Sequence, residues 1–231
     1  MLGKLKYAAP IILVVSGCAT QGVSSYSYTP SSVSAVKNEA EVSAPYSQVW
    51  DKLVRELSKS FYVINNIDKE SRIINLSFST PNASQYIDCG KTHRTYTRGE
   101  TVEKYDYDVA ASSQFRVATE KQEHPAFSNY IVVKRNTNLE GRVNVYLAPS
   151  DTNDKRTMVT VNTRYILNIQ ARRQIVAEHL NGNVFDRGTT SESTSLSFNT
   201  NKSVSQDIGG GQMVTCYSKG KLEKEILDFI N

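Results

Sequence analysis

Residues 44–80 read APYSQVWDKLVRELSKSFYVINNIDKESRIINLSFST, and this stretch decides the predicted fold. Pro45 suits the first position of a helix, because that position needs no N–H donor. From Pro45 to Ser60, apolar residues recur at helical spacing and charged residues fall on the opposite face. The apolar positions are Val49, Trp50, Leu53, Val54, Leu57 and Phe61. The pattern predicts an amphipathic helix with one buried face.

After this helix the apolar residues alternate with polar ones. Residues 61–67 and 73–79 are predicted strands, and Ile74, Leu76 and Phe78 share one face of the second. Similar alternation recurs at 115–117, 130–133, 143–147 and 159–169, and a further strand is expected at 37–43. Strands with one apolar face suit an antiparallel sheet that a helix covers on that side.

The remaining chain supplies two predicted loops and a second helix. Residues 96–123 are polar and rich in tyrosine, residues 181–211 are rich in Ser, Thr, Asn and Gly, and both are expected to form long loops. Residues 219–230 form an amphipathic pattern with Leu222, Ile226, Phe229 and Ile230 on the inner side. We therefore predict an α+β domain over residues 37–231. It consists of an antiparallel sheet with an amphipathic helix packed on one face, long loops and a C-terminal helix.

The run from Ala44 to Trp50, the helix it opens and the strands that begin at Phe61 and Ile73 carry a resemblance to a known family. Over residues 36–80 the chain resembles the repeated unit of the BamC-like outer-membrane lipoproteins. That resemblance implies a helix-grip arrangement and a location in the bacterial envelope. BamC has two such units, whereas this chain has the length and pattern for one. The resemblance names no partner.

The N-terminus has the layout of a secretory signal. Lys4 and Lys6 form a basic start, residues 8–15 are apolar, and Ser16-Gly17-Cys18 follows. A cysteine after Val-Ser-Gly resembles the bacterial lipobox, which implies removal of residues 1–17 and acylation of Cys18. The alternative is an ordinary signal peptide with a chance cysteine. The residue after Cys18 is Ala19, whereas aspartate at this position would favour retention in the inner membrane. For a Gram-negative source, the resemblance to Gram-negative lipoproteins therefore implies the outer membrane, with Cys18 held there by lipid.

Composition narrows the function classes. Residues 18–36 contain few large aliphatic residues, so we predict a flexible tether with an extended reach on the order of 60 Å. The formal net charge is only +4, of which the two leader lysines carry half. This argues against nucleic acid as a partner. No apolar stretch approaches the roughly 20 residues of a membrane-spanning helix.

Few residues suggest chemistry. Cys89 and His93 are four residues apart and could hold a metal or form a thiol–imidazole dyad, but Cys89-Gly90-Lys91-Thr92 is more typical of a turn entering a strand. No nucleophile elbow, phosphate loop or dinucleotide fingerprint is present. We therefore predict no catalytic residues, no metal and no cofactor.

The other cysteines predict a disulfide. Acylation would use Cys18, which leaves Cys89 and Cys216 as a pair in an oxidising compartment. The alternative is two separate thiols.

Taken together, the sequence favours a non-catalytic, lipid-anchored envelope lipoprotein that serves as an accessory or scaffold component of an outer-membrane complex. Its protein partner is not identified by the sequence. A second hypothesis is a binding module that holds a lipid or another apolar ligand between helix and sheet. A third is a periplasmic enzyme with a site that no motif marks.

Overall fold

A computed structural model describes residues 21–32, 35–119, 124, 126–150 and 155–230. Strands account for 61% of the described residues and helices for 13%. The predicted α+β helix-grip class is therefore wrong, and the fold is mostly β with large antiparallel sheets. The described residues contain two α-helices, which are a small part of the fold compared with the sheets.

The helices are α1 (Tyr46–Lys59), the short 3-10 helix η1 (Ala83–Gln85) and α2 (Lys221–Asp228). The strands are β1 (Val23–Thr29), β2 (Glu39–Val42), β3 (Val63–Asp68), β4 (Ile73–Thr80), β5 (Ile87–Asp88), β6 (Lys91–Arg98), β7 (Thr101–Asp108), β8 (Ser113–Ala118), β9 (Phe127–Pro149), β10 (Thr157–His179), β11 (Val184–Asn199), β12 (Val204–Asp207) and β13 (Met213–Ser218).

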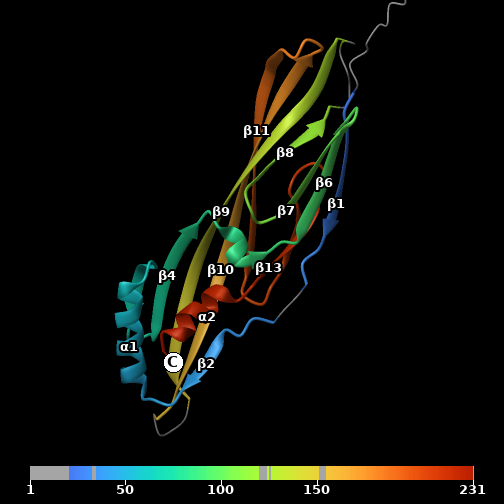
Figure 1. The fold of residues 1–231 in the computed structure, drawn as a ribbon. Helices are drawn as coiled ribbons and strands as arrows, with labels where there is room; N and C mark the ends of the chain where they lie inside the picture. Colours follow the sequence, from blue (N-terminus) through green and yellow to red (C-terminus); the bar gives the residue numbers. More distant parts are fainter. Residues whose placement is uncertain (1–20, 33–34, 120–123, 125, 151–154, 231) are drawn as a thin grey trace, which may run out of the picture.

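Two long strands form the centre of the main sheet (Figure 1). β9 and β10 each have 23 residues and pair with each other throughout. At about 3.3 Å per residue each strand spans roughly 75 Å. On its other edge, β9 pairs with β8 over residues 130–135 and with β4 over residues 139–146. The other edge of β10 pairs with β2 over residues 157–160 and with β11 over residues 164–178. The sheet order is β11-β10-β9-β4-β3, with β2 and β8 at the sides.

The long strands give the molecule two different ends. At one end Phe127 pairs with His179, and at the other Pro149 pairs with Thr157. We call the first the distal end, which comprises the β6–β7 turn (residues 98–101), the β10–β11 turn (residues 179–184) and the start of β1. We call the second the helical end, where α1 and β2 lie (Figure 1).

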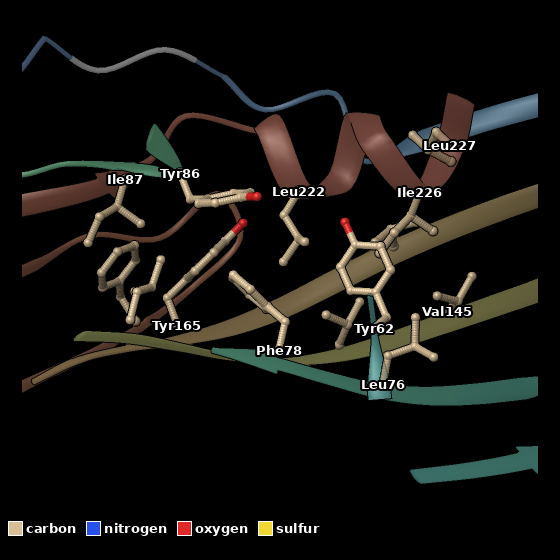
Figure 2. Packing of buried hydrophobic residues seen from close by; sticks show 14 of the residues in the cluster. Tyr62, Leu76, Phe78, Tyr86, Ile87, Val145, Tyr165, Leu222, Ile226 and Leu227 are labelled. Atoms are coloured by element: carbon tan, nitrogen blue, oxygen red, sulfur yellow. The ribbon is translucent and has the colours of Figure 1, made fainter. Parts of the chain in front are cut away.

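The main core lies between the two α-helices and the inner face of the sheet. α1 buries Val49, Trp50, Leu53 and Leu57 in the same cluster as Ile74, Leu76 and Phe78 of β4. α2 adds Leu222 and Ile226, and Figure 2 shows Leu222 directed toward Phe78. Gly141 of β9 makes room for the Phe78 ring, since a Cβ there would lie 1.9 Å from Phe78 Cε1. The side-chain faces predicted for the first helix and for β4 are thus confirmed, except at Phe61. That residue was predicted on the buried face, but it follows the end of α1 and is 63% exposed.

The two predicted loops are wrong as well. Most of residues 96–123 belongs to β6, β7 and β8, and most of residues 181–211 belongs to β11 and β12. A second, smaller core of Tyr96, Tyr130 and Val176 holds this region on β9 and β10. The physical reason for the error is exposure: β11 is exposed on both faces over most of its length, so its side chains do not alternate.

The described part of the predicted tether is also structured. β1 pairs with β6 over seven residues, from Val23 opposite Thr97 to Thr29 opposite Lys91. β1, β6 and β7 form a separate three-stranded sheet. The tether prediction is therefore wrong for this segment, because backbone pairing with β6 holds a sequence too polar to form a core of its own.

Candidate functional site

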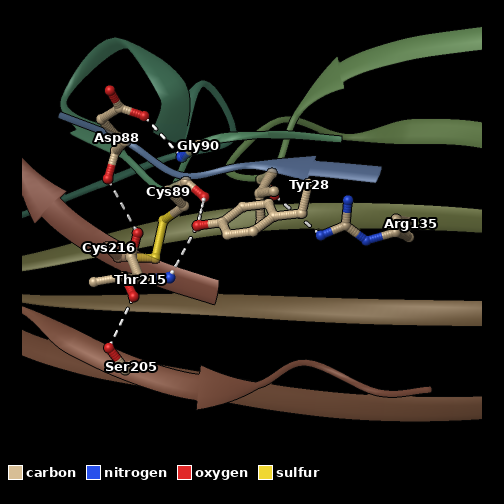
Figure 3. The surroundings of a disulfide bond; sticks show 10 residues. Tyr28, Asp88, Cys89, Gly90, Arg135, Ser205, Thr215 and Cys216 are labelled. Carbon is tan, nitrogen blue, oxygen red and sulfur yellow. Dashed lines mark hydrogen bonds between the residues drawn. A yellow bond between two sulfur atoms is a disulfide. The ribbon is translucent and has the colours of Figure 1, made fainter. Parts of the chain in front are cut away.

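Cys89 and Cys216 form a disulfide with an S–S distance of 2.01 Å, which confirms the predicted pair (Figure 3). Both residues are buried. Beside the bond, the Tyr28 hydroxyl donates to the Cys89 carbonyl oxygen at 3.1 Å and accepts from the Thr215 N–H at 3.1 Å. The disulfide and Tyr28 thus join β1, the β5–β6 junction and β13 at one place.

The other sequence-predicted sites have different outcomes. Cys18 lies outside the described residues, so its acylation stays a prediction. Because Cys89 is bonded to Cys216, it is not a free thiol for His93. His93 Nδ1 instead lies 2.5 Å from Asp106 Oδ1 on the surface. Within the part of the chain that the structure describes, no three His, Cys, Asp or Glu side chains are grouped as metal ligands.

A buried carboxylate, Glu223 of α2, was not foreseen from the sequence. Its oxygens accept from the Tyr165 hydroxyl at 2.9 and 2.8 Å and from the Thr200 hydroxyl at 2.7 Å. Burial, followed by the charge of Glu223, raises the pKa of Tyr165, so this hydroxyl remains a donor. The group ties α2 to β10 and to the turn after β11. All its members are buried and partnered, so its role is structural.

Arg94 of β6 and Arg135 of β9 each pack their guanidinium group against neighbouring elements. Arg94 lies over the rings of Tyr26 and Phe115, with its Cζ 4.8 and 4.5 Å from their centroids. Arg135 is buried, and its Nη2 donates to the Val109 carbonyl at 3.0 Å. Burial lowers the pKa of Arg135. These contacts link β6 to β1 and β8, and they link β9 to the segment after β7. Both cations therefore have a structural role in packing.

The free edge of β11 is the first exposed feature that needs an explanation. β11 ends the strand order of the main sheet, so one of its backbone edges pairs with β10 and no strand of the described chain pairs with the other. From Val184 to Ser193 its side chains are exposed on both faces. Such an edge presents unpaired N–H and C=O groups to any extended segment that can align with it. Figure 1 shows β11 extending beside β10 toward the distal end.

The distal end is the second such feature. Its two turns are held together by Arg98, which donates to the two Glu178 oxygens at 2.7 and 3.1 Å. A surface cavity of about 310 Å³ lies between the turns, lined in part by Thr101 and Leu180. Around it several large apolar side chains are exposed. They are Val23, Val102, Leu180, Val184 and Phe185.

The Arg98–Glu178 pair makes the distal end sensitive to acid. Hydrogen bonds from Arg98 hold the pKa of Glu178 below its ordinary value of 4.5. A pKa lowered by folding contributes stability above the unfolded value, and that contribution is lost as the pH falls through the folded value. Glu178→Gln is expected to lower the free energy of opening the β10–β11 turn at pH 7 by about 1 kcal/mol or less. The difference from wild type should shrink as the pH falls below 4.5 and disappear once Glu178 is protonated in the folded state as well.

Amide hydrogen exchange at Leu180 and Gly182, corrected for intrinsic rates, measures this opening. Glu192→Gln is the matched control, because Glu192 contacts Arg173 at 3.5 Å while more than half exposed. It should change the exchange little at either pH. Equal effects of the two substitutions would contradict the special role of Glu178.

Comparison with known proteins gives no assignment: no family model, no curated protein and no solved structure matches this chain. Among the described residues, neither α-helix has the length and apolar character needed to cross a membrane. The candidate functional site therefore rests on geometry, and it consists of the free β11 edge and the distal end.

Proposed function

We propose that this chain is a non-catalytic lipoprotein, held at the outer membrane by lipid on Cys18, that serves as an accessory or scaffold component of an envelope complex. Its partner contact is the free edge of β11, which takes up an extended segment of an envelope protein as an added strand. The observation that carries this proposal is the length of exposed, unpaired edge from Val184 to Ser193.

The chemistry of this edge fits strand addition. A partner in extended conformation supplies the C=O and N–H groups that the edge lacks, and small side chains let its backbone approach. The central residues, Thr189, Thr190 and Ser191, are small and uncharged. Charged residues flank them, with Asp186 and Arg187 on one side and Glu192 on the other. These charges discourage unspecific pairing and favour one register of the correct partner.

Site-specific photo-crosslinking in cells tests the strand geometry. A photoreactive residue placed in turn at Thr189, Ser191 and Ser193 should trap one envelope protein, with adducts on one short segment of it. Because side chains two apart share a strand face, the trapped position should move by about two residues with each step. Asn144 is the control, since it is exposed on β9, an inner strand of the sheet.

The lipid anchor is tested in the same crosslinking experiment with the variant Cys18→Ser. Cys18→Ser should reduce the yield of the adducts, because the protein would no longer be concentrated at the membrane. Adducts that scatter over many proteins, or that form equally well from Asn144, would contradict strand addition. A Cys18→Ser variant that is processed and fractionates with membranes like wild type would contradict the lipid anchor.

A further inference from the structure

We propose that the distal end itself touches the lipid bilayer, with Leu180 and Phe185 inserted among the phospholipids, so that the long strands stand upright on the membrane. This inference rests on the proposed anchor at Cys18. It adds a direct contact between protein side chains and lipid to that anchor, and it fixes which end of the molecule faces the membrane.

The first argument is the short length of chain between the anchor and the fold. A tether that ended at residue 36 would let the folded part stand far from the bilayer, but β1 is already paired with β6 from Val23 onward. Only four residues separate Cys18 from Val23, so the five steps between them reach at most about 18 Å. Gln21 is already in contact with the fold, since its Nε2 donates to the Thr119 carbonyl at 3.3 Å.

The second argument is where β1 begins. Val23 pairs with Thr97, which in turn pairs with Val102, so the chain enters the fold beside the β6–β7 turn. The pair Arg98–Glu178 places the β10–β11 turn next to it. An acyl group on Cys18 is therefore held near the distal end, whereas the helical end lies roughly 75 Å away along β9.

The third argument is the chemistry of the end. Leu180 is 56% exposed, Val184 60% and Phe185 45%, although each is large and apolar. The backbone of the turn is hydrogen-bonded nevertheless: His179 N–H donates to Asn183 O at 2.8 Å, Gly182 N–H to His179 O at 2.8 Å and Leu180 N–H to Ala126 O at 3.0 Å. These bonds satisfy three N–H groups of the turn, which lowers the cost of bringing it into the membrane interface.

The contact between the turn and the lipid can be weak and still decide orientation. Because the anchor holds the distal end beside the bilayer, insertion is an intramolecular step at high effective concentration. Phe61, which lies between α1 and β3, offers a comparison. It is 63% exposed, but β3 and β4 place it near residue 141 of β9, beyond the reach of the anchor.

Quenching of tryptophan fluorescence by brominated phospholipid tests the contact. The chain from Cys18 to Asn231 is coupled through its N-terminal thiol to a maleimide phosphatidylethanolamine in vesicles of phosphatidylethanolamine and phosphatidylglycerol. Cys89 and Cys216 are bonded to each other, which directs the coupling to Cys18. Trp50, the single tryptophan, is replaced by phenylalanine, and a new tryptophan is placed by Leu180→Trp or, in the control, by Phe61→Trp.

The expected result is a shift of Leu180→Trp emission to shorter wavelength, with strong quenching by lipids brominated on their acyl chains, while Phe61→Trp shows neither change. Circular dichroism verifies that both variants are folded. No quenching of either probe, or equal quenching of both, overturns the proposal. In cells, a photoreactive residue at position 180 should give lipid adducts, and a single protein adduct there would overturn the proposal in favour of a protein partner.

The anchor is tested separately, so the two failures are distinguishable. Mass spectrometry of the mature protein from cells shows whether Cys18 is acylated. An unmodified Cys18 contradicts the proposed function, whereas the vesicle experiment uses a synthetic tether and decides the lipid contact in either case.

Discussion

Replacing both Cys89 and Cys216 by alanine is expected to lower the free energy of unfolding by about 5 kcal/mol. The two residues are 127 positions apart, so the bond closes a loop that contains most of the strands. In the chain-entropy model, a loop of this length greatly restricts the unfolded ensemble. Without the bond, the unfolded chain gains that freedom and the folded state becomes less stable by comparison.

Equilibrium unfolding in guanidinium chloride measures this loss, and Trp50 fluorescence reports the transition because Trp50 is buried in the main core. Wild type unfolded under reducing conditions is the matched control and should lose a similar amount. The double variant is preferable to either single one, since it leaves no unpaired thiol to form wrong disulfides. A loss below about 1 kcal/mol would contradict the expectation. It would show that residual contacts between the β5 and β13 segments already restrict the unfolded chain without the bond.

The features predicted correctly share one property. Each can be inferred from the residue pattern of a short segment or from the number of cysteines in the chain. The burial of Trp50, Leu53 and Leu57 followed from their spacing along one helix face. The burial of Ile74, Leu76 and Phe78 on one face of β4 followed from their alternation with polar residues. The disulfide followed from the number of cysteines left after Cys18. None of these needs knowledge of distant pairing.

The features that were missed depend on distant pairing. β1 is a strand because β6 pairs with it, and β6 lies more than 60 residues further along the chain. Nothing in residues 23–29 themselves distinguishes this strand from a polar tether. β11 is polar on both faces, so its pairing with β10 leaves no periodic mark in the sequence. Overlooking these strands turned a mostly β fold into a predicted α+β fold.

The candidate functional site was missed for the same reason. A free strand edge is a property of sheet order, and the sequence of β11 would look the same if another strand covered it. The distal end likewise combines three segments that lie far apart along the chain, namely the start of β1 and two turns. Exposed Leu180 and Phe185 become informative only once the structure places them beside the start of β1.

Trp50→Ala is expected to lower the free energy of unfolding by about 3–5 kcal/mol, as large-to-small changes in a packed core do. Trp50 is buried on α1 in the same cluster as β4, and its ring centroid lies 5.7 Å from that of Tyr46. Truncation removes a large apolar surface from the core and leaves a cavity between helix and sheet. Circular dichroism during guanidinium unfolding measures the loss.

Phe61→Ala is the matched control for this prediction, because it also removes an aromatic ring near the end of α1. Phe61 is largely exposed, so its removal should change the free energy of unfolding by only about 0.5 kcal/mol. If Trp50→Ala were as mild as Phe61→Ala, α1 would be weakly attached and its apolar face would be available to a partner. A large loss for Trp50 with a small loss for Phe61 makes α1 an integral part of the core. Partner contacts would then have to use the surfaces that folding leaves open, among them the free edge of β11.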